Sequence, residues 1–399
     1  MKVPFFDVKR QYEIIKEDVE EAVVAVMRSG QYIEGPAVKE LEKEMASYLG
    51  VKHVISCANG TDSLCIALKA CGVRPGDEVI TTAFSFFATA EAISGVGAVP
   101  VFADIDEKNF NIDVKDVERK ITKATKAILP VHIFGTPADM DELNALGEKY
   151  NLPVIEDACQ AIGAEYKGKK AGALGTIGCF SFYPTKNLGG FGDGGMITTN
   201  DDKLAESCRA LKAHAAGKLG ARAYQNIYKK EVPELAELES MSGDNLYDPC
   251  KYYNYFIGQN SRLDSIQAAV LHVKLGHLES FNANRTAIAK EYNERLAETP
   301  LVLPPFEYDD RKSCWHQYAV LTEDKEGLSK FLGEKGIGTG SFYPVPLHLQ
   351  KAFQELGYEE GSLEVAEDTC KKSVCLPVFP EMTKEEVDYV IASILEYYN

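Results

Sequence analysis

Short apolar runs alternate with helix-type segments between residues 51 and 200. HVISCA precedes TDSLCIALKACG, EVITTA precedes FSFFATAEAISG, VPVFADI precedes DVKDVERKI, AILPVHIF precedes DMDELNALGEKY, and PVIEDA follows. Nearly continuous Val/Ile runs joined by helices are typical of an α/β fold whose mostly parallel sheet carries helices on both faces. Because such sheets bind ligands at the carboxyl ends of their strands, we expect functional side chains just after these runs.

The pattern changes after about residue 280. A long helical pattern, FNANRTAIAKEYNERLAE, leads to the Pro-rich link TPLVLPPFEYDD, and strand and helix signals alternate from Trp315 onward. A chain of 399 residues is also longer than one ordinary core requires. We therefore predict a large domain over residues 1–280 and a smaller C-terminal α/β domain over residues 281–399.

Composition and charge limit the classes of function. With 45% hydrophobic residues, no run of 18 apolar residues and no signal-peptide core at the start, the chain reads as a cytoplasmic globular protein without a membrane partner. The net charge of −17 argues against nucleic acid, which needs a basic surface. The 10 cysteines include no CxxC pair, so we expect the cysteines to pack as small buried apolar side chains and to form no metal site.

The stretch from Val154 to Asn200 carries the strongest chemical signal. Asp157 ends an apolar run, Ser181 lies in a short β-type run, and Lys186 is flanked by turn residues. Pyridoxal phosphate needs an amine for its aldehyde, an anion for its ring nitrogen and donors for its phosphate. We expect Lys186, Asp157 and Ser181 to fill these roles. A surface lysine and an acidic strand end would explain either residue alone, but they explain the whole stretch less well.

Further candidates lie upstream and just beyond Asp157. Gly60 and Thr61, between a strand run and a helix, are placed to receive a phosphate at a helix N-terminus, although Asn-Gly-Thr-Asp is also an ordinary turn and cap. Phe84 follows the strand EVITTA and could stack on a ring at the same edge, or pack in the core. Gln160 lies one helical turn past Asp157, where it could contact the ring or its hydroxyl.

Several motifs together carry a family resemblance over nearly the whole chain. They are VPFFDVKRQY, GQYIEGPAVKELEKEMASYLG, CANGTDSL, GDEVITTAFSFFATAEAI, VIEDACQAIGA, SFYPTKNLGGFGDGG, NSRLDSIQAAVL and YPVPLHLQ. The chain resembles the DegT/DnrJ/EryC1/StrS sugar aminotransferases, which have the aspartate-aminotransferase-like fold (fold type I) of pyridoxal-phosphate enzymes. This resemblance implies a mostly parallel, seven-stranded-type sheet with helices on both faces and a small C-terminal domain.

The resemblance also implies residue roles. Lys186 would bind the cofactor aldehyde and Asp157 the ring nitrogen. Gln160 and Phe84 would flank the ring. Asn260, in GQNSRLD, matches a residue that such enzymes contribute from the neighbouring subunit to the phosphate, so a homodimer with shared sites is implied. The remaining phosphate contacts would be made by Gly60, Thr61 and Ser181.

The implied reaction is transamination of a keto group on a nucleotide-linked sugar, with glutamate as the expected donor. GQNSRLDSIQAA resembles enzymes acting at C3 more than those acting at C4, so a 3-keto sugar is preferred. A 4-keto sugar or a keto-cyclitol is the alternative within the enzyme class. A non-catalytic regulatory homologue is the alternative outside it, and it is disfavoured because Lys186, Asp157 and Ser181 are all present.

The segment SFYPVPLHLQ departs from the family pattern. Relatives usually have histidine where this chain has Phe342, so one polar contact to substrate is expected to be lost or altered. Tyr343 and His348 would either border the nucleotide-sugar cleft or pack in the core. Arg262 would meet an anionic group of the substrate or close an interface salt bridge. His316 and Trp315, in CWHQYAVL, are expected to be structural.

A polar insertion near residues 218–253 precedes Asn260. From Glu231 to Asp248 it holds six acidic residues and no basic one. A solvated loop is the simpler interpretation. The alternative is that these carboxylates flank the neighbouring substrate mouth and slow the capture of highly anionic substrates.

Overall fold

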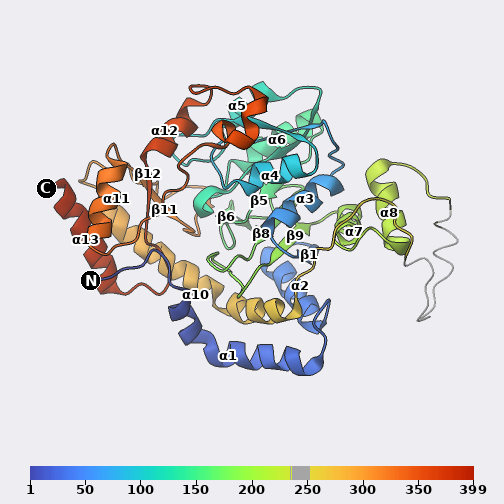
Figure 1. Cartoon of the computed structure of the whole chain (residues 1–399), viewed down its shortest axis with the longest axis horizontal. Helices are drawn as coiled ribbons and strands as arrows, with labels where there is room; N and C mark the ends of the chain where they lie inside the picture. Colours follow the sequence, from blue (N-terminus) through green and yellow to red (C-terminus); the bar gives the residue numbers. More distant parts are fainter. Residues whose placement is uncertain (234, 236–251) are drawn as a thin grey trace.

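A computed structural model of the chain describes residues 1–233, 235 and 252–399 (Figure 1). Its centre is one layer of strands, in which the four-stranded sheet β1-β9-β8-β5 meets the three-stranded sheet β3-β2-β4. Parallel bridges between Ile128 and Val154 and between Val131 and Asp157 join the β4 and β5 edges. The strands are β1 His53–Cys57, β2 Glu78–Thr82, β3 Val99–Ala103, β4 Thr125–Leu129, β5 Ile155–Asp157, β8 Ile177–Ser181 and β9 Gly195–Thr199.

The sheet confirms the mostly parallel layer predicted from the Val/Ile runs. Strand β9 pairs antiparallel with β1 and β8, while β2 pairs parallel with β3 and β4, and β5 parallel with β8. In β8, Cys179 packs in the core on one face and the next residue, Phe180, in the core on the other. Because successive side chains point to opposite faces, a strand covered on both sides must be apolar throughout.

Helices cover both faces of this sheet. Leu64 and Leu68 of α3 join the core cluster on one face, and Leu41 of α2 and Leu271 of α10 join the cluster on the other. The helices of the large part are α1 Val8–Ser29, α2 Pro36–Leu49, α3 Gly60–Ala70, α4 Ala88–Gly95, α5 Val114–Lys120, α6 Met140–Tyr150, α7 Asp202–Leu211, α8 Gly217–Tyr228 and α10 Ser265–Arg295.

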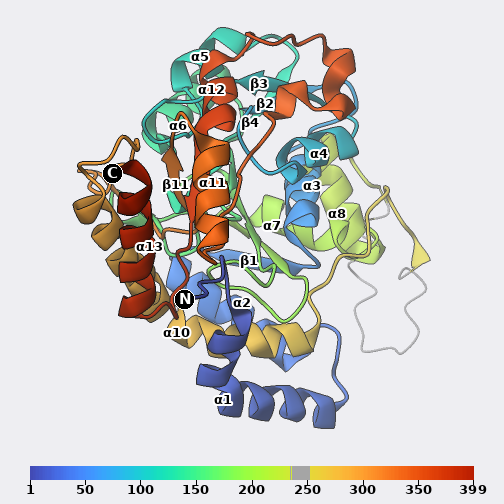
Figure 2. The ribbon, with the colours of Figure 1, turned by 60° about the vertical axis from the view of Figure 1, so that its left-hand side comes forward.

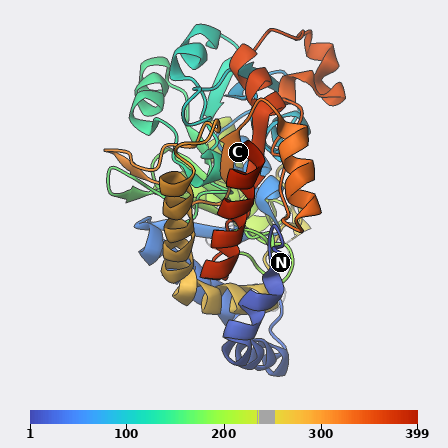
Figure 3. The ribbon, with the colours of Figure 1, turned by 90° about the vertical axis from the view of Figure 1, so that its left-hand side faces the viewer.

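The C-terminal part is built on the antiparallel pair β11 and β12. Its strands and helices are β11 Tyr318–Leu321, α11 Lys325–Glu334, α12 Glu364–Lys372, β12 Ser373–Leu376 and α13 Lys384–Tyr398. The N-terminal segment returns to this part, because Val3 bridges Ile337 and shares its core, and the N-terminus lies beside it in Figure 2 and Figure 3. The fold therefore places both ends of the chain together.

Helix α10 is shared by the two parts. Leu271 and Leu278 pack under the large sheet, whereas Ile288 and Tyr292 pack in the C-terminal core. Residue 280, where the sequence analysis places the domain boundary, lies within this continuous helix. The division at 280/281 stays a prediction.

Two expectations from the sequence bear on the rest of the chain, and the smaller elements complete the fold. Within the described residues, no helix is both long and apolar enough to cross a membrane. Most of the acidic stretch from Glu231 to Asp248 lies outside the described residues. The remaining elements are β6 Glu165–Tyr166, β7 Lys169–Lys170 and β10 Arg311–Lys312, which form a small sheet, and the 3-10 turns η1 Ile133–Gly135, η3 Leu347–Leu349 and η4 Lys351–Leu356.

Candidate active site

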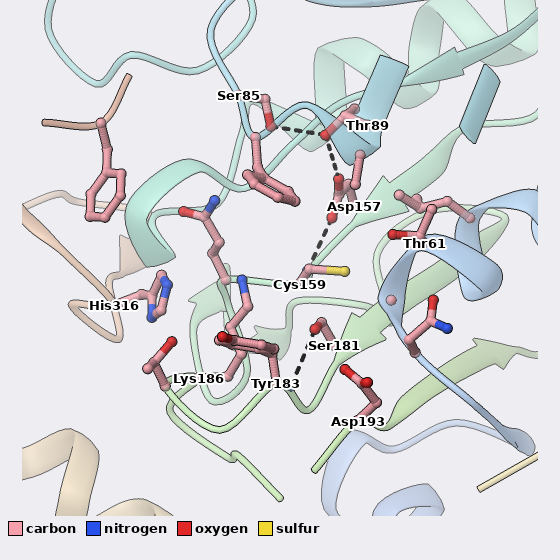
Figure 4. A pocket seen from close by; sticks show the side chains of 18 of the residues that line it. Thr61, Ser85, Thr89, Asp157, Cys159, Ser181, Tyr183, Lys186, Asp193 and His316 are labelled. Carbon is pink, nitrogen blue, oxygen red and sulfur yellow. Dashed lines mark hydrogen bonds between the residues drawn. The ribbon is translucent and has the colours of Figure 1, made fainter. Parts of the chain in front are cut away.

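A cavity of about 770 Å³ opens where the parallel strands end (Figure 4). One side, which we term the sheet wall, comes from strand ends and the start of α3, and comprises Gly60, Thr61, Asp157, Ser181 and Lys186. The other, which we term the C-terminal wall, comprises His316, Gln317, Phe342 and Tyr343. The sheet wall lies at the edge predicted for ligands, because β1, β5 and β8 run parallel and end there.

Asp157 is the last residue of β5, and only 5% of its surface is exposed. The Thr89 hydroxyl donates to its Oδ2 at 2.9 Å, and the Cys159 amide N–H donates to its Oδ1 at 3.2 Å. Ser85 lies 2.9 Å from the Thr89 hydroxyl and extends this network. The donors hold a buried carboxylate in one orientation, so that it can face a cationic group in the cavity.

Lys186 lies in the turn that follows β8. Its amide N–H donates to the Tyr183 carbonyl at 2.8 Å, which holds the turn. Burial lowers the pKa of the Lys186 amine below its ordinary value, although Cys159 and Asp157 act to raise it. A lower pKa leaves more of the amine neutral, which is the form that attacks a carbonyl.

The start of α3 forms a pocket for an anion beside Ser181. The Asn59 side chain caps the helix by accepting from the Asp62 N–H at 2.8 Å, while the N–H groups of Gly60 and Thr61 have no partner within the helix. Ser181 Oγ accepts from the Tyr183 N–H at 3.3 Å, which leaves its own hydrogen for a ligand. These donors suit a phosphate group.

Glycine is required at position 60 by close packing. A Cβ there would lie 2.6 Å from the Ser181 Cβ and 3.1 Å from the Cys159 sulfur. Substitution would therefore push the helix start away from Ser181. The tight approach keeps the backbone N–H groups and the serine hydroxyl in one cradle.

Gln160 joins the two walls. Its Oε1 accepts from the Phe134 N–H at 2.8 Å and its Nε2 donates to the Tyr343 hydroxyl at 3.1 Å. Burial raises the pKa of Tyr343, so this hydroxyl stays protonated. Both side chains line the cavity, as the sequence analysis expects for Gln160 and as one of its two interpretations expects for Tyr343.

Phe84 lies outside the cavity. It is fully buried in a core cluster, where its ring contacts those of Phe110, Phe134 and Tyr343. Phe86 lines the cavity instead, with 59% of its surface exposed. Both follow the end of β2, where the chain turns and strand alternation no longer tells which ring faces the ligand.

Three other predicted residues do not line this cavity within the described chain. His348 is buried and lies 3.0 Å from Glu367, which supports the packing interpretation. Asn260 is exposed and bridges Ala213, and Arg262 is half-buried. In the single chain, Asn260 is therefore exposed and lies outside the cavity.

Sequence reasoning missed two kinds of residue. Ser85 and Thr89, which support Asp157, appear in FSFFATA only as hydroxyls near a strand end. His316, expected to be structural, is 7% exposed and lines the cavity, and its Nδ1 lies 3.1 Å from Asn187 Oδ1. No local sequence pattern predicts the contact of Thr89 with Asp157 or that of His316 with Asn187, since the partners come from distant segments.

The residues present fit pyridoxal phosphate. An amine of lowered pKa, an oriented carboxylate and a phosphate cradle line one cavity, and these are the three groups that the cofactor requires. An α/β layer with this strand order and site defines a fold type I enzyme of the aminotransferase class.

The chain belongs to the DegT/DnrJ/EryC1/StrS aminotransferase family, whose model matches residues 13–395. It is 46% identical over 400 residues to a pleiotropic regulatory protein of Geobacillus stearothermophilus, covering 100% of this chain and 99% of the relative. It is 38% identical to dTDP-3-amino-3,4,6-trideoxy-α-D-glucose transaminase of Streptomyces venezuelae, covering 99% and 96%.

A solved structure of a relative is similar to this chain as well. The crystal structure of NtdA from Bacillus subtilis with bound cofactor PMP has a TM-score of 0.84 and 32% identity, covering 100% of this chain and 85% of that one. PMP is the amino form of pyridoxal phosphate. The protein is accordingly a pyridoxal-phosphate-dependent aminotransferase.

Proposed function

We propose that this enzyme transfers the amino group of glutamate to the 3-keto group of a nucleotide-linked sugar. The observation that carries the proposal is the convergence of Lys186, Asp157 and the α3 N-terminus on one large cavity. The S. venezuelae relative, named for a dTDP-3-amino sugar, supports the substrate class. The cavity volume leaves space for a sugar beside the cofactor.

Lys186 and Asp157 divide the chemical work in this proposal. Bound pyridoxal phosphate supplies an electron sink for the carbanion formed at the amino-bearing carbon. The Lys186 amine binds the cofactor aldehyde, is displaced by the amino donor, and then carries the proton removed from the donor's α-carbon. Asp157, held by Thr89 and the Cys159 N–H, keeps a proton on the ring nitrogen.

The other cofactor contacts follow from the same geometry. Gly60, Thr61 and Ser181 bind the phosphate through the helix N-terminus and one hydroxyl. Gln160 is held beside the ring by Phe134 and Tyr343. Phe86 replaces Phe84 as the aromatic side chain that contacts the ring, because it is the one that lines the cavity.

We further propose a homodimer whose sites are shared. Asn260 is exposed in one chain, and the loop before it presents Tyr252, Tyr253 and Ile257, which are 80%, 65% and 88% exposed. Exposed apolar side chains of this size are typical of a surface that a partner covers. In the dimer, Asn260 binds the phosphate in the neighbouring site and Arg262 lies at the interface.

Isotope transfer tests the proposed function. A panel of nucleotide 3-keto sugars, 4-keto sugars and keto-cyclitols is incubated with [15N]glutamate, and products are identified by mass spectrometry and NMR. The proposal predicts heavy nitrogen at C3 of a nucleotide sugar. Heavy nitrogen at C4, or in a cyclitol only, would show that the substrate is a 4-keto sugar or a keto-cyclitol and not a 3-keto sugar.

The name of the Geobacillus relative favours one second candidate, a regulatory role. A regulator that had lost catalysis would not exchange nitrogen between glutamate and 2-oxoglutarate. Exchange by the purified, cofactor-loaded protein would therefore exclude a purely regulatory role. Absence of exchange with glutamate, together with a normal cofactor absorbance band, would call for the same assay with other amino acids, and only absence of exchange with all of them would favour that role.

A further inference from the structure

His316 is a polar group of the C-terminal wall that the proposed chemistry leaves unused. It lies in the segment between β10 and β11 and is 7% exposed, and Figure 4 places its ring at the side of the cavity nearest Lys186. Burial, with the charges of Lys186 and Arg285, holds the pKa of His316 well below its ordinary value. The ring is therefore neutral, and one of its nitrogens carries no hydrogen.

A chain of amide hydrogen bonds decides which nitrogen that is. Asn282 Nδ2 donates to the Ile162 carbonyl at 3.1 Å, so Asn282 presents its oxygen to Asn187. Asn187 Nδ2 donates to that oxygen and to the Cys314 carbonyl, each at 2.8 Å. Since the two carbonyls can only accept, both amide orientations are determined. Asn187 Oδ1 is left as an acceptor, 3.1 Å from His316 Nδ1.

The tautomer follows from this chain. Nδ1 carries the hydrogen and donates it to Asn187, so Nε2 of the neutral ring is a lone-pair acceptor. Among the described residues, no hydrogen-bond donor to Nε2 is found. Asn187 directly follows Lys186 in the chain, so the same turn that presents the amine also orients the imidazole. Because His316 lines the cavity, a molecule bound there can supply a donor to Nε2.

We propose that His316 Nε2 accepts a hydrogen bond from a ring hydroxyl of the sugar substrate and so selects the sugar over the amino acid. This inference rests on the proposed function. A sugar hydroxyl can donate to Nε2, whereas the carboxylates of glutamate only accept. The one donor of glutamate is its amino group, which is the group that reacts with the cofactor. The simpler alternative, a histidine that only packs in the wall, leaves the fixed acceptor without a use.

Two substitutions at His316 test the role through separate half-reactions. His316→Leu removes the acceptor, and His316→Gln can return an oxygen near the Nε2 position. His272→Leu, at an exposed histidine that pairs with Glu44, is the matched control. The probes for the cofactor-loaded enzyme are glutamate, dTDP-3-amino-3,4,6-trideoxy-α-D-glucose and the counterpart that retains the 4-hydroxyl. Each reaction is followed by the loss of the pyridoxal absorbance band.

We expect His316→Leu to raise the apparent dissociation constant of a dTDP sugar about tenfold, while glutamate changes less than about twofold. His316→Gln should recover part of the loss. A loss confined to the 4-hydroxylated probe would assign the contact to that hydroxyl, and a loss with both probes to the 2-hydroxyl. Equal losses in the glutamate and sugar half-reactions, or none in either, would overturn the inference.

A measurement on the unaltered protein covers the case in which the variants fail to fold. With 15N-labelled histidine, the His316 Nε2 resonance should have the position of an unprotonated nitrogen and should shift when a dTDP sugar is added, but not with glutamate. An Nε2 that bears hydrogen, or that shifts only with glutamate, would contradict the inference. Wild-type enzyme that reacts with glutamate but with no nucleotide sugar would instead overturn the proposed function.

Discussion

The sheet wall and the C-terminal wall face the same cavity but are assembled differently. In the sheet wall, Asp157, Ser181 and Lys186 lie within one short stretch of sequence, at the ends of adjacent parallel strands. In the C-terminal wall, His316 and Tyr343 are placed by contacts with Asn187 and Gln160, far away in sequence. Three groups of the sheet wall thus come from one local stretch, which Gly60 and Thr61 join from a distant segment, whereas the C-terminal wall depends on tertiary packing throughout.

This difference indicates which amino-acid substitutions each wall can accept. Strand ends are rigid, so the sheet wall can hold reacting groups in one geometry. Loops carry the C-terminal wall, so one of its side chains, such as Phe342, can be replaced without disturbing the strands. Substitutions should therefore affect rate on one wall and substrate choice on the other.

The largest effect is expected at Lys186. Lys186→Ala removes both the amine that binds the aldehyde and the proton carrier, so kcat should fall by about 10³-fold or more. The cradle at Gly60, Thr61 and Ser181 remains, and cofactor should still bind noncovalently. Steady-state assays and absorbance spectra check both parts, and substantial turnover by this variant would contradict the assignment.

Asp157→Asn is expected to come next. A neutral amide cannot keep the ring nitrogen protonated, so we expect a loss of about 10²- to 10³-fold in kcat with modest loss of cofactor. Asp193→Asn is the matched control, since Asp193 lines the same cavity but is exposed. We expect it to change kcat less than about tenfold. Equal effects of the two substitutions would remove the special role of Asp157.

Mixed dimers should distinguish the subunit that supplies Asn260 from the one that supplies Lys186. If Asn260→Ala is inactive, mixing it with Lys186→Ala should restore up to about a quarter of wild-type activity, since half of the random dimers would hold one intact site. Sedimentation measures assembly, and a tagged subunit confirms exchange. A monomer, or exchange without recovery, would refute the shared site.

Smaller effects are expected at Phe84 and Phe86, the two phenylalanines after β2, of which one packs in the core and the other lines the cavity. Phe84→Ala should cost about 3–5 kcal/mol of unfolding free energy, because it empties a fully buried core site. Phe86→Ala should cost less than about 1 kcal/mol but weaken cofactor retention, since its ring is exposed to the cavity. Chemical denaturation and cofactor titration measure the two effects. The reverse pattern would restore Phe84 as the ring contact.

Local order in the sequence is sufficient to predict the parallel layer and to place Asp157 and Lys186 at its edge. The Val/Ile runs predict the parallel layer because strands buried on both faces must be apolar, and Asp157 and Lys186 are apparent because each follows such a run. Helix–strand alternation could not show that β9 inserts between β1 and β8, since that pairing brings together residues far apart in the chain. The choice of Phe86 over Phe84 and the position of His316 likewise depend on loop geometry.

The central claim is that Lys186 binds the cofactor aldehyde within the sheet wall. Borohydride reduction of the cofactor-loaded enzyme, followed by digestion and mass spectrometry, tests it most directly. The account predicts a single pyridoxyl label, on the peptide containing Lys186, and its loss in the Lys186→Ala variant. A label on Lys212, Lys274 or any other lysine, with Lys186 unmodified, would contradict it.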